Sequence, residues 1–244
     1  MGQPRLFSLI DKACYDYELI ENGDRILIGA SGGKDSTALI EYFANRAKRK
    51  NCGFEYKALH VQSEFGGVLP LNIMELFEKW QVPFERVVID VQDRLKDGRK
   101  MNCYWCSTQR RTELNDYAIK NGYNKICLGH HMDDVLETFL MNAIGKGELS
   151  TMIPKLKYNK YPVSIIRPLY YADVPLIVEH AKNMGYFGYT CTCDFQDNST
   201  RKDARSKLDV LTDGDYQKKA MLLKALKNVN LEYLPTAESK RRYN

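Results

Sequence analysis

The chain has 244 residues, a formal net charge of +5, and 44% hydrophobic and 27% charged side chains. This composition excludes a wholly disordered chain, and the length allows one large domain with a substantial core. No apolar run approaches the roughly 18 residues of a membrane span, and residues 1–19 lack the apolar core of a signal peptide. We therefore expect a cytoplasmic protein without a membrane partner.

Residues 1–24 are expected to form an N-terminal helical extension. Beyond them, apolar runs typical of buried strands alternate with stretches of helical periodicity. The strand-like runs lie at 25–30, 55–61, 83–91, 125–130 and 163–169, and the helix-like stretches at 35–50, 71–80, 108–121, 133–144 and 174–184. This alternation predicts an α/β fold in which a parallel five-stranded sheet carries helices on both faces.

The later part of the chain is less regular. Residues 145–162 are rich in Gly, Lys, Pro and Tyr and predict a long loop. We expect a main domain at 25–190, followed at 191–244 by a late cysteine pair and a basic helical segment. From residue 200 to the end, eleven Lys and Arg stand against six acids, which is compatible with an RNA substrate and equally typical of solvated helices.

A glycine-rich turn follows the first predicted strand, where residues 31–36 read Ser-Gly-Gly-Lys-Asp-Ser. Glycines let the backbone approach an anion closely, and the unpaired N–H groups of the following helix point at it. Lys34 adds a positive charge. The spacing excludes a Walker A loop, because Ile28 stands where its first glycine belongs and Asp35 where its Ser or Thr belongs. Hydroxyl donors are supplied by Ser31, Ser36 and Thr37.

A second polar cluster follows the fourth predicted strand, where residues 129–134 read Gly-His-His-Met-Asp-Asp. In parallel sheets, ligands bind beyond the carboxyl ends of the strands, so this cluster, the glycine-rich turn and His60 are expected to converge. Gly129 permits close backbone approach to a ligand, and the acids suit the handling of ATP and Mg²⁺. Either aspartate could instead cap the helix that begins here.

Four cysteines form two closely spaced pairs, Cys103 with Cys106 and Cys191 with Cys193. Four thiolates are the usual ligand set of structural zinc, and an iron–sulfur cluster uses the same ligand type. Spacing alone leaves zinc and a cluster equally open, with a redox disulfide as a third option. The odd total of seven cysteines argues against a secreted disulfide framework.

The order of these motifs resembles that of the PP-loop ATP pyrophosphatases, and in particular the tRNA 2-thiocytidine synthetase (TtcA) family. The resemblance covers roughly residues 20–200 and rests on the SGGKDS turn, the CxxC pair, GHHMDDVLET at 129–138 and IRPL at 166–169. The chain departs from the family in two places. Its late cysteines are spaced CxC instead of CxxC, and its second strand ends His-Val-Gln where the family often has His-Val-Asp.

The resemblance implies an adenine nucleotide alpha hydrolase-like fold and ATP-dependent thiolation of tRNA. Such an enzyme adenylates a nucleobase carbonyl, here expected at cytidine C2 in the anticodon loop, and replaces the oxygen with sulfur. The resemblance further implies Mg²⁺ and a [4Fe–4S] cluster with three cysteine ligands: Cys103, Cys106 and Cys193, with Cys191 as the alternative third ligand. The sulfur donor would be a cysteine desulfurase or inorganic sulfide, and a homodimer is compatible with this interpretation.

The family's functional residues carry over onto the matching positions of this chain. Lys34 and Asp35 are the expected catalytic residues. The expected ATP-binding residues are Ala30, Ser31, Gly32, Gly33, Lys34, Ser36, Thr37, His60, Gly129, His130, Asp133 and Asp134. The expected RNA-binding residues are Arg110, Arg111, Arg201, Lys202 and Arg205.

Two other functions stay open at this point. A PP-loop tRNA ligase of the lysidine-synthetase type would use the same ATP site and would need Cys103 and Cys106 only for structural zinc. A non-catalytic nucleotide- or metal-binding RNA module would not need Lys34, Asp35 and the acids at 133–134, so their presence argues against it.

Overall fold

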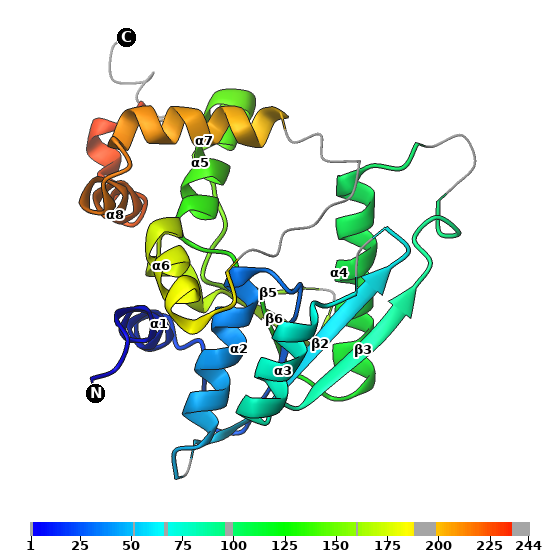
Figure 1. Ribbon diagram of the computed structural model, residues 1–244. Coiled ribbons are helices and arrows are strands. Elements are labelled where there is room, and N and C mark those ends of the chain that lie inside the picture. Colours follow the sequence, from blue (N-terminus) through cyan, green and yellow to red (C-terminus); the bar gives the residue numbers. More distant parts are fainter. Residues whose placement is uncertain are drawn as a thin grey trace.

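The computed structural model describes residues 2–50, 52–65, 68–95, 100–159, 161–187 and 199–235. Helices and strands alternate along most of this length (Figure 1). In chain order they are α1 (Arg5–Asp16), β1 (Asp24–Gly29), α2 (Lys34–Ala47), β2 (Phe54–Ser63), α3 (Leu71–Trp80), β3 (Phe84–Ile89), α4 (Cys103–Lys120), β4 (Lys125–Cys127), α5 (Met132–Lys146), β5 (Lys155–Lys157), β6 (Ser164–Ile166), the 3₁₀ turn η1 (Pro168–Tyr171), α6 (Val174–Met184), α7 (Ser199–Thr212), α8 (Tyr216–Ala225) and the 3₁₀ turn η2 (Leu231–Tyr233).

The strands form one sheet in the order β3-β2-β1-β4-β6-β5. The five predicted strands are present and parallel, which confirms the predicted α/β fold class. A sixth strand, β5, lies in the stretch expected to be a loop and pairs antiparallel with β6, Lys155 opposite Ile166. Three residues are too few to show an alternating pattern, so the pairing depends on the partner strand that β6 offers.

The sheet separates two apolar layers, because alternate side chains of a strand point to opposite faces. On β1, Ile26 and Ile28 join the larger core with α2 and α3, whereas Leu27 joins a smaller core under α4. On β4, Cys127 and Ile126 divide in the same way. Figure 1 shows α2 and α3 on one side of the sheet and α4 on the other, as the alternation predicts.

The N-terminal and C-terminal extensions belong to the larger core. From α1, Leu6 and Ile10 are buried in it, and from α7 and α8 so are Leu208 and Leu223. The helices predicted after residue 200 are therefore present, but they pack on the sheet domain instead of standing apart from it. Within the described part of the chain, no helix has both the length and the apolar character that crossing a membrane requires.

Helix α4 begins five residues earlier than the predicted start at residue 108. The side chain of Asn102 caps it by accepting a hydrogen bond from the backbone N–H of Trp105 at 2.8 Å. The predicted start at residue 108 left Cys103 and Cys106 outside the helix, whereas both cysteines stand on its first turn.

Candidate active site

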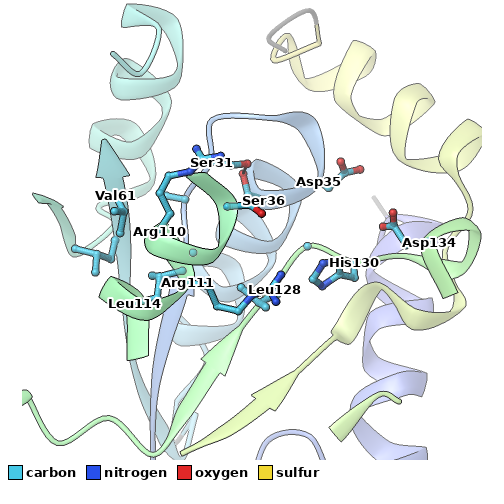
Figure 2. A pocket seen from close by; sticks show the side chains of 15 residues that line it. Ser31, Asp35, Ser36, Val61, Arg110, Arg111, Leu114, Leu128, His130 and Asp134 are labelled. Carbon is cyan, nitrogen blue, oxygen red and sulfur yellow. Dashed lines mark hydrogen bonds between the residues drawn. The ribbon is translucent and has the colours of Figure 1, made fainter. Parts of the chain in front are cut away.

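A cavity of about 330 Å³ lies at the carboxyl ends of β1 and β4, between the start of α2 and the side of α4. These two strands are neighbours at the point where the strand order reverses, which is where open α/β sheets bind ligands. Figure 2 shows Asp35 and Asp134 on one side of the cavity and Arg110 and Arg111 on the other. The lining includes nine predicted residues: Ala30, Ser31, Asp35, Ser36, Arg110, Arg111, Gly129, His130 and Asp134.

The glycine-rich turn is held by short contacts between its own groups. Ser36 Oγ lies 3.0 Å from Ser31 Oγ and donates to the Gly33 carbonyl at 3.0 Å. Gly32 has a φ of 83°, a conformation that glycine adopts without strain. In the described part of the chain, no side chain caps the N-terminus of α2. Its first N–H groups therefore remain available to an anion, which the helix dipole also favours.

The other predicted phosphate-site residues lie around the turn without lining the cavity. Lys34 is half-buried, and its Nζ lies 3.0 Å from the Asp35 carboxylate. Thr37 is fully buried beneath the turn. His60 Nδ1 lies 2.7 Å from the Ala30 carbonyl oxygen. Because a carbonyl only accepts, the proton is on Nδ1, and His60 fixes the backbone where β1 enters the turn.

His130 and Asp134 line the cavity at the start of α5. Burial lowers the pKa of His130 to about 4, against the opposing effect of the Asp134 charge. Burial also acts to raise the pKa of Asp134, but His131, His130 and Arg201 outweigh it and hold that pKa below its ordinary value. At neutral pH the cavity therefore presents a neutral imidazole beside an ionised carboxylate.

Asp133, the neighbouring acid, is turned away from the cavity. One of its carboxylate oxygens accepts from the backbone N–H of Val174 at 2.8 Å, and the other accepts from Lys219 Nζ at 2.7 Å. Asp133 and Lys219 are both buried. Through these two contacts Asp133 anchors α6 and α8 to α5.

The CxxC pair directly precedes the polar α4 residues that line the cavity, which are Ser107, Arg110 and Arg111. Cys103 and Cys106 are both half-buried, and Cys106 Sγ lies 3.7 Å from Ser63 Oγ at the end of β2. Trp105, between them, is anchored by its indole N–H to the Val91 carbonyl at 3.2 Å. Two thiols one turn apart at the rim of a cationic wall match the donor type of an iron–sulfur cluster.

Two of the sequence-predicted metal ligands, Cys191 and Cys193, lie outside the described residues. Among the residues that the structure does describe, no group of three His, Cys, Asp or Glu side chains could hold a metal ion. Of the predicted cysteine ligands, the described residues therefore include only Cys103 and Cys106.

The basic residues of α7 were expected to bind RNA, but two of them are engaged inside the protein. Arg201 Nη1 donates to Asp134 Oδ1 at 3.1 Å, and Arg205 Nε donates to Glu137 Oε1 at 2.7 Å. Lys202 is exposed. Of the predicted RNA-binding residues, Arg110 and Arg111 line the cavity, Lys202 and Arg205 are exposed, and Arg201 is half-buried.

The cavity also has an apolar lining that the sequence analysis missed, made by Leu59, Val61, Leu114 and Leu128. These residues continue the apolar pattern of β2, α4 and β4, so nothing in the sequence separates them from core residues. Such a lining suits the face of a purine or pyrimidine ring, while the polar edge of the cavity suits phosphate.

Comparison with known proteins places this geometry in context. The family model described as "PP-loop domain" matches residues 8–206. The chain is 34% identical over 240 residues to a tRNA-cytidine(32) 2-sulfurtransferase of Alkalilimnicola ehrlichii, covering 97% of this chain and 76% of that protein. It is 32% identical over 244 residues to the protein of that name from Vibrio parahaemolyticus, covering 97% and 81%.

Two solved structures share the fold. The U34-tRNA thiolase NcsA from Methanococcus maripaludis, solved with its [4Fe-4S] cluster, superimposes with a TM-score of 0.75 at 20% identity, covering 96% of this chain and 80% of that one. NMN synthetase from Francisella tularensis superimposes with a TM-score of 0.55 at 14% identity, covering 95% and 96%. At these identities the likeness concerns the fold, the PP-loop sheet and its helices.

Proposed function

Since this chain belongs to the PP-loop family and, within it, to the family of the tRNA-cytidine(32) 2-sulfurtransferases, we propose that it is an ATP-dependent tRNA sulfurtransferase. The target that the relatives' name suggests is the C2 carbonyl of cytidine 32. ATP and a [4Fe–4S] cluster are the cofactors of this proposal, with Mg²⁺ bound beside the phosphates.

One observation carries the proposal: a glycine-rich phosphate turn lines a cavity whose opposite wall, on α4, begins at Ser107, directly after the CxxC pair. Ser31 and Ser36 line it from the turn, and Arg110 lines it from α4, one turn beyond Cys106. A ligase with structural zinc would not require its cysteines at the rim of the nucleotide site. A sulfur-transfer enzyme does, because the activated base and the sulfur must meet.

The first step that we propose is adenylation. The ATP phosphates rest on the free N–H groups of α2, and Lys34 offsets the charge that develops on the leaving pyrophosphate. The nucleobase carbonyl oxygen attacks the α-phosphorus, an O–P bond forms, and the bond to pyrophosphate breaks. Asp35, at the cavity edge and 3.0 Å from Lys34, is the residue that we expect to hold Mg²⁺.

The second step exchanges oxygen for sulfur. Adenylation turns the carbonyl oxygen into a good leaving group, so sulfide adds to C2, AMP departs with the oxygen, and a thiocarbonyl remains. With inorganic sulfide no redox partner is needed, because sulfur keeps its oxidation state. Persulfide sulfur from a cysteine desulfurase would first need two electrons from a thiol reductant, which release it as sulfide. Cys103, Cys106 and one late cysteine, Cys193 or Cys191, are the ligands that we propose for the cluster, which would supply an activated sulfur nucleophile when bound.

The anionic substrate must reach a cavity that opens at the end of the sheet. Arg110 and Arg111 on its α4 wall are the residues that we propose to contact the RNA, with Lys202 on the surface of α7. The target base would be unstacked to enter. We propose a cysteine desulfurase or inorganic sulfide as sulfur donor, the cytoplasm as the place of reaction, and a homodimer as an assembly to be tested.

The test is anaerobic thiolation of tRNA by the cluster-loaded protein, with 2-thiocytidine measured by mass spectrometry of the digested RNA. Cys103→Ala is expected to abolish thiolation and to leave ATP affinity within about twofold, because Cys103 is not among the residues that line the cavity. Cys52→Ala, a half-buried cysteine on the loop before β2, is the matched control and should stay active. A colourless zinc protein without thiolation, or loss of ATP binding in Cys103→Ala, would refute the proposal.

A further inference from the structure

Both carboxylate oxygens of Asp134 are held from outside the cavity that this residue lines. Oδ2 accepts from the His131 backbone N–H at 3.1 Å, which completes the capping box of α5. Oδ1 accepts from Arg201 Nη1 at 3.1 Å. Asp134 keeps only 13% of its side-chain surface exposed. Its orientation in the cavity therefore depends on a residue 67 positions later in the chain.

Helix α7 does not need Arg201 to stay docked. One turn further on, Arg205 pairs with Glu137, whose side chain is 1% exposed, at 2.7 Å. Ala204 and Leu208, on the same helix, are buried in the main core. In Figure 1, α7 lies across α5. Arg201 pairs with Asp134 and also lies 3.9 Å from Glu137 Oε2, whereas Arg205 pairs with Glu137, one turn further along α5. The first pair reaches the cavity and the second does not.

The difference between the two pairs matters because the cavity has the features of a phosphate site. An ionised carboxylate in its wall repels a polyanion unless a cation offsets the charge, and Arg201 is the cation on Asp134. We propose that Arg201 is a positioning residue for the nucleotide: it fixes Asp134 and offsets its charge so that the cavity accepts ATP. This inference rests on the proposed ATP site, and it replaces the expected RNA contact of Arg201.

The experiment compares Arg201→Gln with Arg205→Gln in the full-length protein. Affinity for a non-hydrolysable ATP analogue with Mg²⁺ is measured by calorimetry, and folding is checked by thermal melting. Arg201→Gln is expected to weaken nucleotide binding about tenfold, the size of one lost charge-assisted contact. Arg205→Gln should lower the melting temperature and leave the affinity within about twofold. Arg201→Lys, which keeps the charge, should recover most of the affinity.

A second background separates positioning from direct contact with ATP. If Arg201 acts through Asp134, then Arg201→Gln should change the affinity by less than about twofold in a protein that already carries Asp134→Asn. An equal tenfold loss in that background would overturn the inference. So would unchanged nucleotide affinity combined with weaker tRNA binding, which would return Arg201 to an RNA contact. Failure of the unaltered protein to bind the analogue would overturn both this inference and the proposed function.

Discussion

The imidazole of His130 lines a cavity that is proposed to receive phosphates, and it does so without charge. Burial is the main reason that its pKa falls to about 4, and the nearby Arg167, Arg111 and Arg201 lower the pKa further. A neutral imidazole can donate one hydrogen bond and accept another. It can therefore contact a nucleotide without competing with the arginines for the phosphate charge.

The depressed pKa of His130 predicts how stability depends on pH. The folded imidazole has a pKa of about 4, below its ordinary value of 6.5, so unfolding takes up a proton between these limits. The contribution of His130 to the free energy of unfolding should be complete above pH 6.5 and should fall as the pH drops towards 4. The loss due to this residue is at most about 3 kcal/mol.

Urea denaturation at several pH values between 7 and 4.5 measures this effect. His130→Gln, which has no ionisable ring, should show a shallower decline of the unfolding free energy than the unaltered protein. Equal slopes for the two proteins would mean that the imidazole is already protonated in the folded state, and the neutral-donor role of His130 would have to be abandoned.

At the residue scale, the GHHMDD motif indicated where the cavity lies but not which of its two acids lines it. Asp133 and Asp134 are adjacent, and adjacent helical residues point about 100° apart, so only one could enter the cavity. The sequence does not indicate which acid lines the cavity, because the buried partner of Asp133 is Lys219, 86 residues later in the chain. Arg201 was likewise recognised only as a positive charge, since its partner Asp134 lies 67 positions earlier in the chain.

At the scale of elements, the loop between β4 and α5 packs directly on the start of α2. A Cβ atom at Gly129 would lie 3.1 Å from the backbone nitrogen of Ser36 and 3.2 Å from the carbonyl carbon of Asp35. Both of these neighbours are backbone atoms that cannot move aside. The absence of a side chain at Gly129 therefore sets the distance between the two motifs that border the cavity.

This packing predicts that Gly129→Ala pushes the two loops apart. We expect a loss of about 1–3 kcal/mol in unfolding free energy and a clear loss of ATP affinity, because the phosphate turn would shift. Gly145→Ala is the matched control: it lies in α5, has nothing within 4 Å of its Cβ position, and should be neutral or slightly stabilising. Unfolding curves and calorimetry with the ATP analogue check both; unchanged affinity in Gly129→Ala would contradict the close packing.

Elements with a strong pattern were predicted and those without one were missed. The five parallel strands can be recognised in the sequence as apolar runs. Their parallel arrangement follows from their alternation with helices along the chain. Helix α4 starts before its apolar periodicity does, because Asn102 caps it and the CxxC pair occupies its first turn. Strand β5 forms because it pairs with the edge strand β6, and no local sequence pattern indicates that pairing.

At the scale of the whole molecule, the three predicted parts of the chain share one core. Helix α1 brings Leu6 and Ile10 into it, and α8 brings Leu223. The buried ion pair of Lys219 with Asp133 fastens α8 to the start of α5, and the second oxygen of that acid holds the start of α6. The C-terminal helices are thus joined to the site through charge as well as through apolar contact.

Lys219→Met tests whether this junction stabilises the molecule as one unit. Removing the lysine leaves the buried Asp133 carboxylate uncompensated, which costs about 3–5 kcal/mol. Lys218→Met is the matched control. The Lys218 ammonium is exposed and pairs with Asp213 on the surface, so its removal should leave the free energy of unfolding nearly unchanged. Urea unfolding followed by tryptophan fluorescence and by circular dichroism should give one coincident transition for each protein.

The double variant Lys219→Met with Asp133→Asn tests whether the uncompensated carboxylate causes the loss of unfolding free energy. It removes the stranded charge while keeping an amide oxygen for the N–H of Val174, so it should be more stable than Lys219→Met alone. If Lys219→Met instead unfolds in two steps, with α7 and α8 lost before the sheet, the C-terminal helices are a separate cooperative unit. Their hold on Asp134 through Arg201 would then fail under milder conditions than the sheet itself, and ATP affinity should fall with that first step.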